Sequence, residues 1–111
     1  MEKLPTPENV GDKEKRLAGL LKERGVEDPE ARSLLDSWTR GQESEVKESS
    51  DPATAAIELN LRKARLYFAA GHGEEAFESF EAAQMQARNE NRDELYQTII
   101  AEMDRLESEQ G

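Results

Sequence analysis

The sequence predicts an all-α fold of about five helices, on three observations. Leu (11), Ala (13) and Glu (19) together supply 43 of the 111 residues, whereas Val (3), Ile (3) and Thr (4) supply only 10. The first group favours helices, and the second group suits pleated sheets. Apolar residues recur at intervals of three and four, which is the period of a helix, and no apolar–polar alternation of strand length occurs.

Length and composition exclude several classes of protein. A chain of 111 residues has room for one domain, and no stretch reaches the roughly 18 apolar residues of a membrane span. Because the chain has no cysteine, it has no disulfide framework, thiolate zinc site or cysteine nucleophile. The first residues are acidic and proline-containing, unlike a secretion signal. We therefore expect a cytoplasmic protein.

Residues 1–11 contain two prolines and a glycine and little apolar character, which predicts a flexible arm. A single helical domain is expected to follow over residues 12–108. Its first part, residues 12–41, is predicted to be a helix pair. The first helix starts after Asp12 and ends before Gly25, and the second starts at the Asp28–Pro29 pair, a favourable helix N-terminus.

The polar segment 42–50 is interpreted as a linker or, alternatively, as a frayed continuation of the second helix past Gly41. A second Asp-Pro pair opens the longest helix, which runs to about Ala70. Since this helix is apolar on more than one side, we expect it to lie between neighbours. A short glycine-containing turn then leads into a helix over 74–87, so that residues 51–90 form a helical hairpin.

The last predicted element is a capping helix over residues 91–108. Asn91 and Glu94 have the spacing of a capping box, in which each side chain bonds to the other residue's backbone N–H. Four apolar residues at helical spacing would face the hairpin, namely Leu95, Ile99, Met103 and Leu106.

Part of the hairpin resembles a known family. Small residues, aromatic residues and a turn glycine alternate at fixed spacing through Ala64, Tyr67, Gly71, Ala76, Phe80 and Ala83. This pattern, over about residues 57–90, resembles a tetratricopeptide repeat (TPR). The resemblance implies a right-handed array in which alanines let two antiparallel helices approach while Tyr67 and Phe80 fill the space between them. Asn60 and Lys63 depart from the family pattern, and no proline follows the second helix.

The family usually binds peptides or partner helices in a concave groove, so the resemblance implies an interaction module such as an adaptor, scaffold or regulatory subunit. The residues that would contact the partner are Trp38, Glu58, Leu61, Arg65 and Phe68. Alternatively, these large side chains pack against residues 31–38 within the chain, and this reading is favoured because so short a chain needs them for its core. A homodimer formed through residues 92–107 or 12–38, and a small acidic chaperone for an aggregation-prone partner, remain further alternatives.

The charge of the chain argues against two kinds of partner. Residues 74–111 contain eleven acidic side chains and three arginines, whereas residues 1–73 are close to balanced, with fourteen acidic and twelve basic side chains. Nucleic acids and anionic membranes bind through clustered Lys and Arg, so neither is an expected partner. The acidic residues Glu74, Glu78 and Glu81 share one helix face, which is interpreted as a solvated face in preference to an acidic docking site.

The sequence predicts no catalysis, cofactor or metal. His72 is the only histidine, and it lies in the predicted turn. No paired-histidine zinc motif, nucleophile elbow or glycine-rich phosphate loop accompanies it. We therefore interpret His72 as a turn residue and expect that the chain is not an enzyme.

Overall fold

The computed structural model describes the backbone of residues 7–110 and the side chains of residues 13–109. This part of the chain contains five helices and no strand. The helices are α1 (Pro7–Arg24), α2 (Pro29–Glu48), α3 (Pro52–Ala69), α4 (Gly73–Asn89) and α5 (Asp93–Gln110). The predicted all-α fold of about five helices is confirmed.

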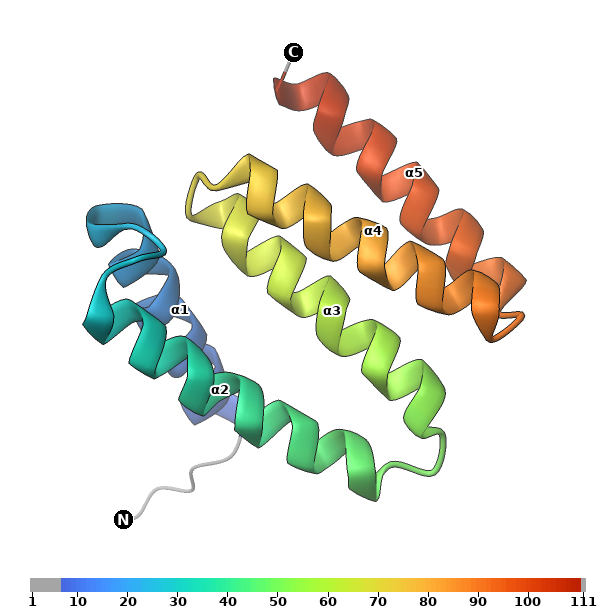
Figure 1. The fold of residues 1–111 in the computed structure, drawn as a ribbon, viewed down its shortest axis with the longest axis horizontal. Coiled ribbons are helices and arrows are strands. Elements are labelled where there is room, and N and C mark those ends of the chain that lie inside the picture. Colours follow the sequence, from blue (N-terminus) through green and yellow to red (C-terminus); the bar gives the residue numbers. More distant parts are fainter. Residues whose placement is uncertain (1–6, 111) are drawn as a thin grey trace.

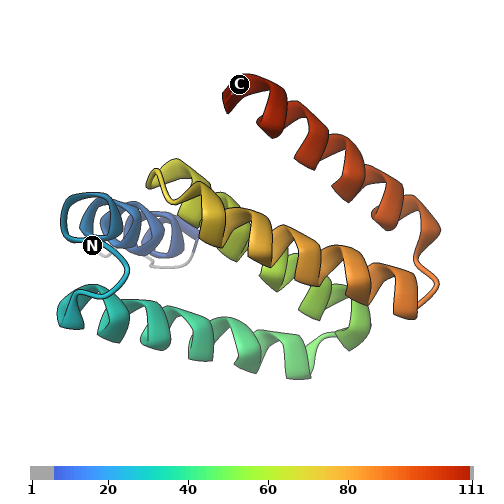
Figure 2. The same ribbon diagram turned by 45° about the horizontal axis from the view of Figure 1, so that its top comes forward.

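The helix α3 lies at the centre of the array (Figure 1). It packs antiparallel against α4 on one side and against α1 and α2 on the other, while α5 packs against α4. A second view also places α5 beside α4 and away from α2 (Figure 2). The prediction that the third helix has neighbours on more than one side is therefore confirmed. The molecule measures 42 × 37 × 24 Å, so it is only about two helix diameters thick.

The apolar side chains form two cores that share α3. The C-terminal core joins α3, α4 and α5 through Ile57, Leu61, Ala64, Phe80, Ala83, Ala87, Ile99 and Leu106. The N-terminal core joins α1, α2 and α3 through Leu17, Leu21, Ala31, Trp38, Leu66 and Ala70. Because α3 buries side chains in both cores, the two halves are expected to unfold together.

Within the hairpin, Phe80 packs in the same core as Ala64 and Ala83, and all three are fully buried. The expected position of Tyr67 is wrong. Its half-buried ring packs against the N-terminal core and does not share the C-terminal core with Phe80. The reason is that α1 and α2 cover the side of α3 that carries Leu66, and they offer the ring an apolar surface there.

Two left-handed residues terminate the hairpin helices. Gly71 has φ 87° and Asn91 has φ 59°. In each case the following residue donates a backbone hydrogen bond five residues back, from His72 to Tyr67 and from Arg92 to Ala87. This pattern is a Schellman motif. The predicted capping box at Asn91 is therefore wrong, because Asn91 ends α4 in a conformation that an N-cap does not adopt.

The boundaries of the first two helices differ from those predicted. α1 begins at Pro7, five residues before Asp12, because proline has no N–H to lose in a first helical turn. The expected arm over 1–11 is thus helical from Pro7, and residues 1–6 lie outside the described residues. α2 continues to Glu48, so the linker reading of 42–50 is wrong and the helical continuation is correct. Gln42 explains the continuation, since it is buried and accepts a hydrogen bond from Arg62 of α3.

Both Asp-Pro pairs start helices as predicted. The Asp28 carboxylate accepts a hydrogen bond from the Ala31 N–H at 3.0 Å, and that of Asp51 accepts one from the Thr54 N–H at 3.3 Å. Each aspartate therefore satisfies an otherwise unpaired donor of the first turn.

Candidate interaction surface

Two of the five predicted partner residues lie inside the protein. Trp38 is 2% exposed in the N-terminal core, and its indole N–H donates to Glu14 of α1 at 3.3 Å. Leu61 is 4% exposed in the C-terminal core. These two side chains are not accessible to a partner. The alternative in which they pack within the chain accounts for both, although Leu61 packs toward α4 and α5, not toward residues 31–38.

The other three lie on α3. Glu58 and Arg65 are exposed, and Phe68 is half-buried against the C-terminal core. The Arg65 guanidinium donates to both oxygens of Glu102 in α5, at 2.9 and 2.8 Å. This hydrogen-bonded pairing raises the pKa of Arg65 and lowers the pKa of Glu102. Arg65 therefore links α3 to α5 within the fold.

Charged and small side chains line the surface between α3 and α5. A hollow of about 620 Å³ there is lined by Arg65, Thr98, Ala101, Glu102 and Arg105. Apolar side chains that would anchor a partner are scarce in this lining, and its central charges are already paired. This hollow on the face that the family resemblance implies for binding therefore offers a partner no large apolar side chain.

A second polar link joins the starts of α3 and α5. The Arg92 guanidinium donates to the Thr54 hydroxyl at 3.0 Å and to the Asp51 carboxylate at 3.2 Å. The pKa of Asp51 is lowered, first by its hydrogen bonds with Thr54 and then by Arg92. Asp51 helps to hold these helix ends in place, and so its lowered pKa has a structural cause.

His72 also makes a structural contact. Its Nε2 lies 2.7 Å from the carbonyl oxygen of Leu21 in α1. Since a carbonyl only accepts, Nε2 carries the hydrogen. Among the described residues, no group of three or more His, Cys, Asp or Glu side chains is placed to hold a metal ion.

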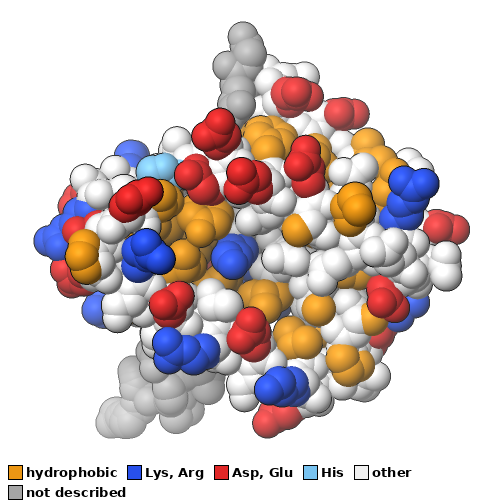
Figure 3. Space-filling view, viewed as in Figure 1, with side chains coloured by type: hydrophobic (Ala, Val, Ile, Leu, Met, Phe, Trp, Pro, Cys, Tyr) orange, Lys and Arg blue, Asp and Glu red, His pale blue; other side chains and the backbone are white. Residues whose placement is uncertain are grey.

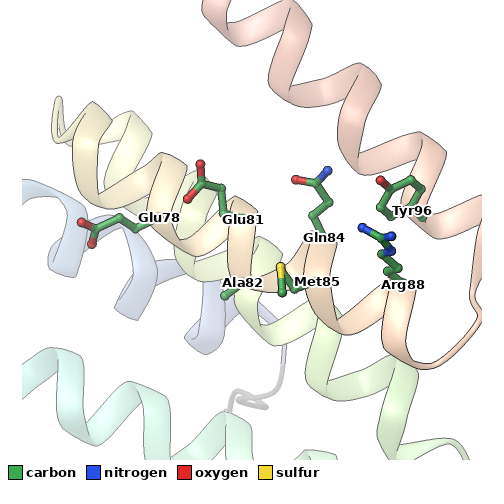
Figure 4. Close-up of a pocket in the computed structure, with 7 residues that line it drawn as sticks. All are labelled: Glu78, Glu81, Ala82, Gln84, Met85, Arg88 and Tyr96. Atoms are coloured by element: carbon green, nitrogen blue, oxygen red, sulfur yellow. The ribbon is translucent and has the colours of Figure 1, made fainter.

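An open surface lined by several large apolar side chains lies between α4 and α5. We call it the α4–α5 groove, and it consists of two adjoining hollows, of about 490 and 380 Å³, that share Glu81 and Gln84. Figure 4 shows the first hollow, where Gln84 and Arg88 extend from α4 into the space that Tyr96 enters from α5. The apolar lining of the groove comprises Phe77, Ala82, Met85, Tyr96, Ile100 and Met103.

Met85 distinguishes this groove from the rest of the surface. Its side chain is 60% exposed. Among the residues that the structure describes, Met85 is the only large apolar side chain that is exposed. Phe77, Ile100 and Met103 in the adjoining hollow are only half-buried. Full burial of an exposed large apolar side chain is favourable by roughly 1.5–3 kcal/mol. A partner that covers the groove would therefore gain binding free energy from these side chains.

The edges of the groove are acidic. Glu78 and Glu81 line it from α4, Asp104 and Glu107 line it from α5, and Arg88 is the one base in its lining. All four carboxylates are exposed and form no ion pair with a described residue. Figure 3 shows acidic side chains gathered over α4 on one face of the molecule.

Sequence reasoning did not find this groove. The pattern of α4 indicates a solvated face at Glu78 and Glu81, and Met85 is flanked in the sequence by Gln84 and Gln86. One signal was available. α5 carries Tyr96 and Ile100 beside its main apolar stripe. Contact with α4 leaves both of these side chains only half-buried.

Comparisons with protein-family models, with curated proteins and with solved structures each return no match for this chain. Within the described residues, no helix combines the length and apolar character needed to cross a bilayer.

Proposed function

We propose that this chain is a non-catalytic protein–protein interaction module, an adaptor, scaffold or regulatory subunit, that binds a helix of a partner protein in the α4–α5 groove. The observation that carries the proposal is the exposure of Met85 in one hollow of the groove, together with half-buried Phe77, Ile100 and Met103 in the adjoining hollow. A chain with 35% hydrophobic residues has few large apolar side chains to spare. A group of them open to water at one groove is typical of an interaction site.

The groove is built from rigid elements. α4 is anchored in the C-terminal core by Phe80 and Ala83, and α5 by Ile99 and Leu106. A surface that is already formed needs little ordering when a partner binds, and this lowers the entropic cost of association. Met85 and Met103 are flexible enough to adapt to the side chains that they meet.

The TPR resemblance implies a partner on the α3–α5 face instead. We favour the α4–α5 groove because the hollow between α3 and α5 is lined by no large apolar side chain and its Arg65–Glu102 pair is already formed. A partner at that face would have to compete with a bidentate ion pair, whereas a partner in the α4–α5 groove covers apolar surface.

Site-specific photo-crosslinking in cells of the natural source tests the proposal. A photoreactive amino acid replaces Met85 in one variant and Arg65 in a second, and Arg32 on the exposed side of α2 provides the control position. We expect a discrete adduct from position 85, and we expect Ile100→Asp in the same chain to abolish it. The captured protein must then re-form the adduct when both proteins are purified.

Other outcomes would assign other functions. An adduct of twice the 12.5 kDa chain mass would indicate a homodimer. A partner that precipitates whenever this chain is withdrawn would indicate a chaperone. An adduct from position 65 but not from position 85 would place binding on the α3–α5 face and would contradict the proposal.

A further inference from the structure

We propose that the helix bound in the α4–α5 groove is a basic amphipathic one, with Lys or Arg residues on both sides of an apolar stripe. This inference rests on the proposed function and adds the chemistry of the partner. It follows from the pattern of charge around the groove, from the groove's length and from the kind of side chains at its base.

Acidic side chains border the groove on both sides. Glu78 and Glu81 stand on the α4 side, and Asp104 and Glu107 stand on the α5 side. Because no described residue forms an ion pair with these carboxylates, a partner's cations can approach them without displacing an existing partner. Complementary charge around an apolar centre selects the partner and speeds association.

The same charges disfavour a second copy of this chain. In a two-fold dimer through the groove, each copy would present the same acidic border to the other. The chain as a whole carries a net charge of −10, and the four carboxylates of each border would face those of the other copy with Arg88 as the one base in the lining. An acidic partner helix is disfavoured for the same reason.

The dimensions suit a short helix. The lining extends from Phe77 to Arg88 along α4 and from Tyr96 to Glu107 along α5. Eleven residue steps at 1.5 Å give about 16 Å, or about three helical turns. A helix satisfies its own backbone hydrogen bonds, and apolar residues at its positions i, i+3 or i+4, and i+7 would lie over the apolar base of the groove.

Two designed peptides provide the test. Both are fluorescein-labelled helices of about 14 residues with the same leucine stripe, and they differ only in whether Lys or Glu flanks the stripe. Binding to the full chain is measured by fluorescence anisotropy at two salt concentrations. We expect the Lys peptide to bind at least tenfold more tightly than the Glu peptide, with a difference that shrinks at high salt.

Charge reversal in the protein locates the effect. Glu81→Lys with Asp104→Lys should weaken binding of the Lys peptide at least tenfold and strengthen binding of the Glu peptide. Glu43→Lys with Glu45→Lys is the matched control, since both residues are exposed on α2 and the net charge changes by the same amount. The control should leave the preference for the Lys peptide largely intact.

Each contrary outcome overturns the inference and is distinguishable from failure of the proposed function. If the two peptides bind equally well and Met85→Asp abolishes binding of both, the groove is an apolar site without charge selection. The proposed function would then stand. An equal effect of the α2 control would show non-specific attraction.

A chain that dimerises in sedimentation experiments, and becomes monomeric on Ile100→Asp, would assign the groove to a second copy. Absence of binding by either peptide would also reject a basic helix as the occupant, and the crosslinking experiment would then decide the proposed function separately.

Discussion

His72 in the turn between α3 and α4 is hydrogen-bonded to Leu21 near the end of α1, with Nε2 2.7 Å from the carbonyl oxygen. The same carbonyl accepts the Gly25 N–H that ends α1, at 2.9 Å. Fifty-one residues separate the two partners in sequence. The contact therefore fixes the hairpin turn to the N-terminal helix pair and helps to align the two cores.

His72→Ala should lower the free energy of unfolding by about 0.5–1.5 kcal/mol, the usual net value of one hydrogen bond. The loss should stay in this range because the Leu21 carbonyl keeps its bond from Gly25. Urea denaturation followed by circular dichroism measures the change. Glu74→Ala, an exposed neighbour, is the control. Equal stability of the two variants would show that the His72 contact does not link the cores.

Trp38→Ala should lower the free energy of unfolding by about 3–5 kcal/mol, because it removes a large buried side chain and its bond to Glu14. Trp38→Phe keeps an aromatic ring in place and should cost much less. Guanidinium denaturation with circular dichroism compares the variants. A stability loss for Trp38→Ala as small as that of Trp38→Phe would contradict the buried position of the indole.

Gly71→Ala should lower the free energy of unfolding by about 1 kcal/mol, since an L-residue is strained at φ 87°. No atom lies within 4 Å of the added methyl group, so the cost comes from the backbone alone. Asn91→Gly tests the same principle in reverse. It relieves the strain of a non-glycine residue at φ 59° and should leave stability unchanged or slightly raised. Thermal denaturation of both variants measures the effects, and a stabilising Gly71→Ala would contradict the left-handed turn.

The Arg65–Glu102 pair predicts a specific pH dependence. Because the pKa of Glu102 is lowered below its ordinary value of 4.5 in the folded protein, the pair contributes stability above that value. The contribution disappears as the pH falls through the folded pKa. With the Arg65 side chain 52% exposed, solvent screening limits the contribution to about 0.5–1 kcal/mol.

Urea denaturation of Glu102→Gln between pH 7 and pH 2 measures this contribution. The variant should be less stable than the unmodified chain at pH 7, and the difference should vanish at low pH. Glu107→Gln, which removes a carboxylate without an ion pair to a described residue, is the control. A constant difference across the pH range would show that the Arg65–Glu102 pair does not stabilise the fold.

Much of the fold follows from local sequence signals. The Asp-Pro pairs at 28 and 51 are strong N-terminal signals, and both start helices as expected. The apolar breadth of α3 predicts its central position because a helix needs a neighbour for each apolar side. Gly71 is a helix terminator because only glycine adopts its conformation readily.

Two of the three failures share a physical cause. Gly41 reads as a helix stop, but Gln42 beyond it is buried against Arg62, twenty residues away in sequence. Asn91 has the spacing of a capping box, yet it closes the preceding helix. The repeat-like pattern places the Tyr67 ring between α3 and α4, but the ring packs against the core that α1 and α2 form with α3. The outcomes at Gln42 and Tyr67 depend on contacts between distant segments, which single-sequence patterns do not contain. Asn91 instead closes α4 through local hydrogen bonds, from its own N–H to Arg88 and from the Arg92 N–H to Ala87.

The candidate surface was less predictable than the fold. Trp38 and Leu61 are large and apolar, and so they suit either a core or an interface, and only their burial distinguishes the two. The α4–α5 groove needs the pairing of α4 with α5, which brings Met85 near Tyr96 and Phe77 near Met103. No spacing within either helix reveals that pairing.

The most direct test of the account is a titration of the ¹⁵N-labelled chain with the Lys-flanked peptide, followed by two-dimensional NMR. The account predicts that the amide signals of Phe77, Glu81, Met85, Ile100 and Met103 shift most. It also predicts that the signals of Glu58, Arg65 and Ala69 on the exposed side of α3 stay unchanged. Shifts concentrated on those three α3 residues, with the α4–α5 signals unmoved, would contradict it.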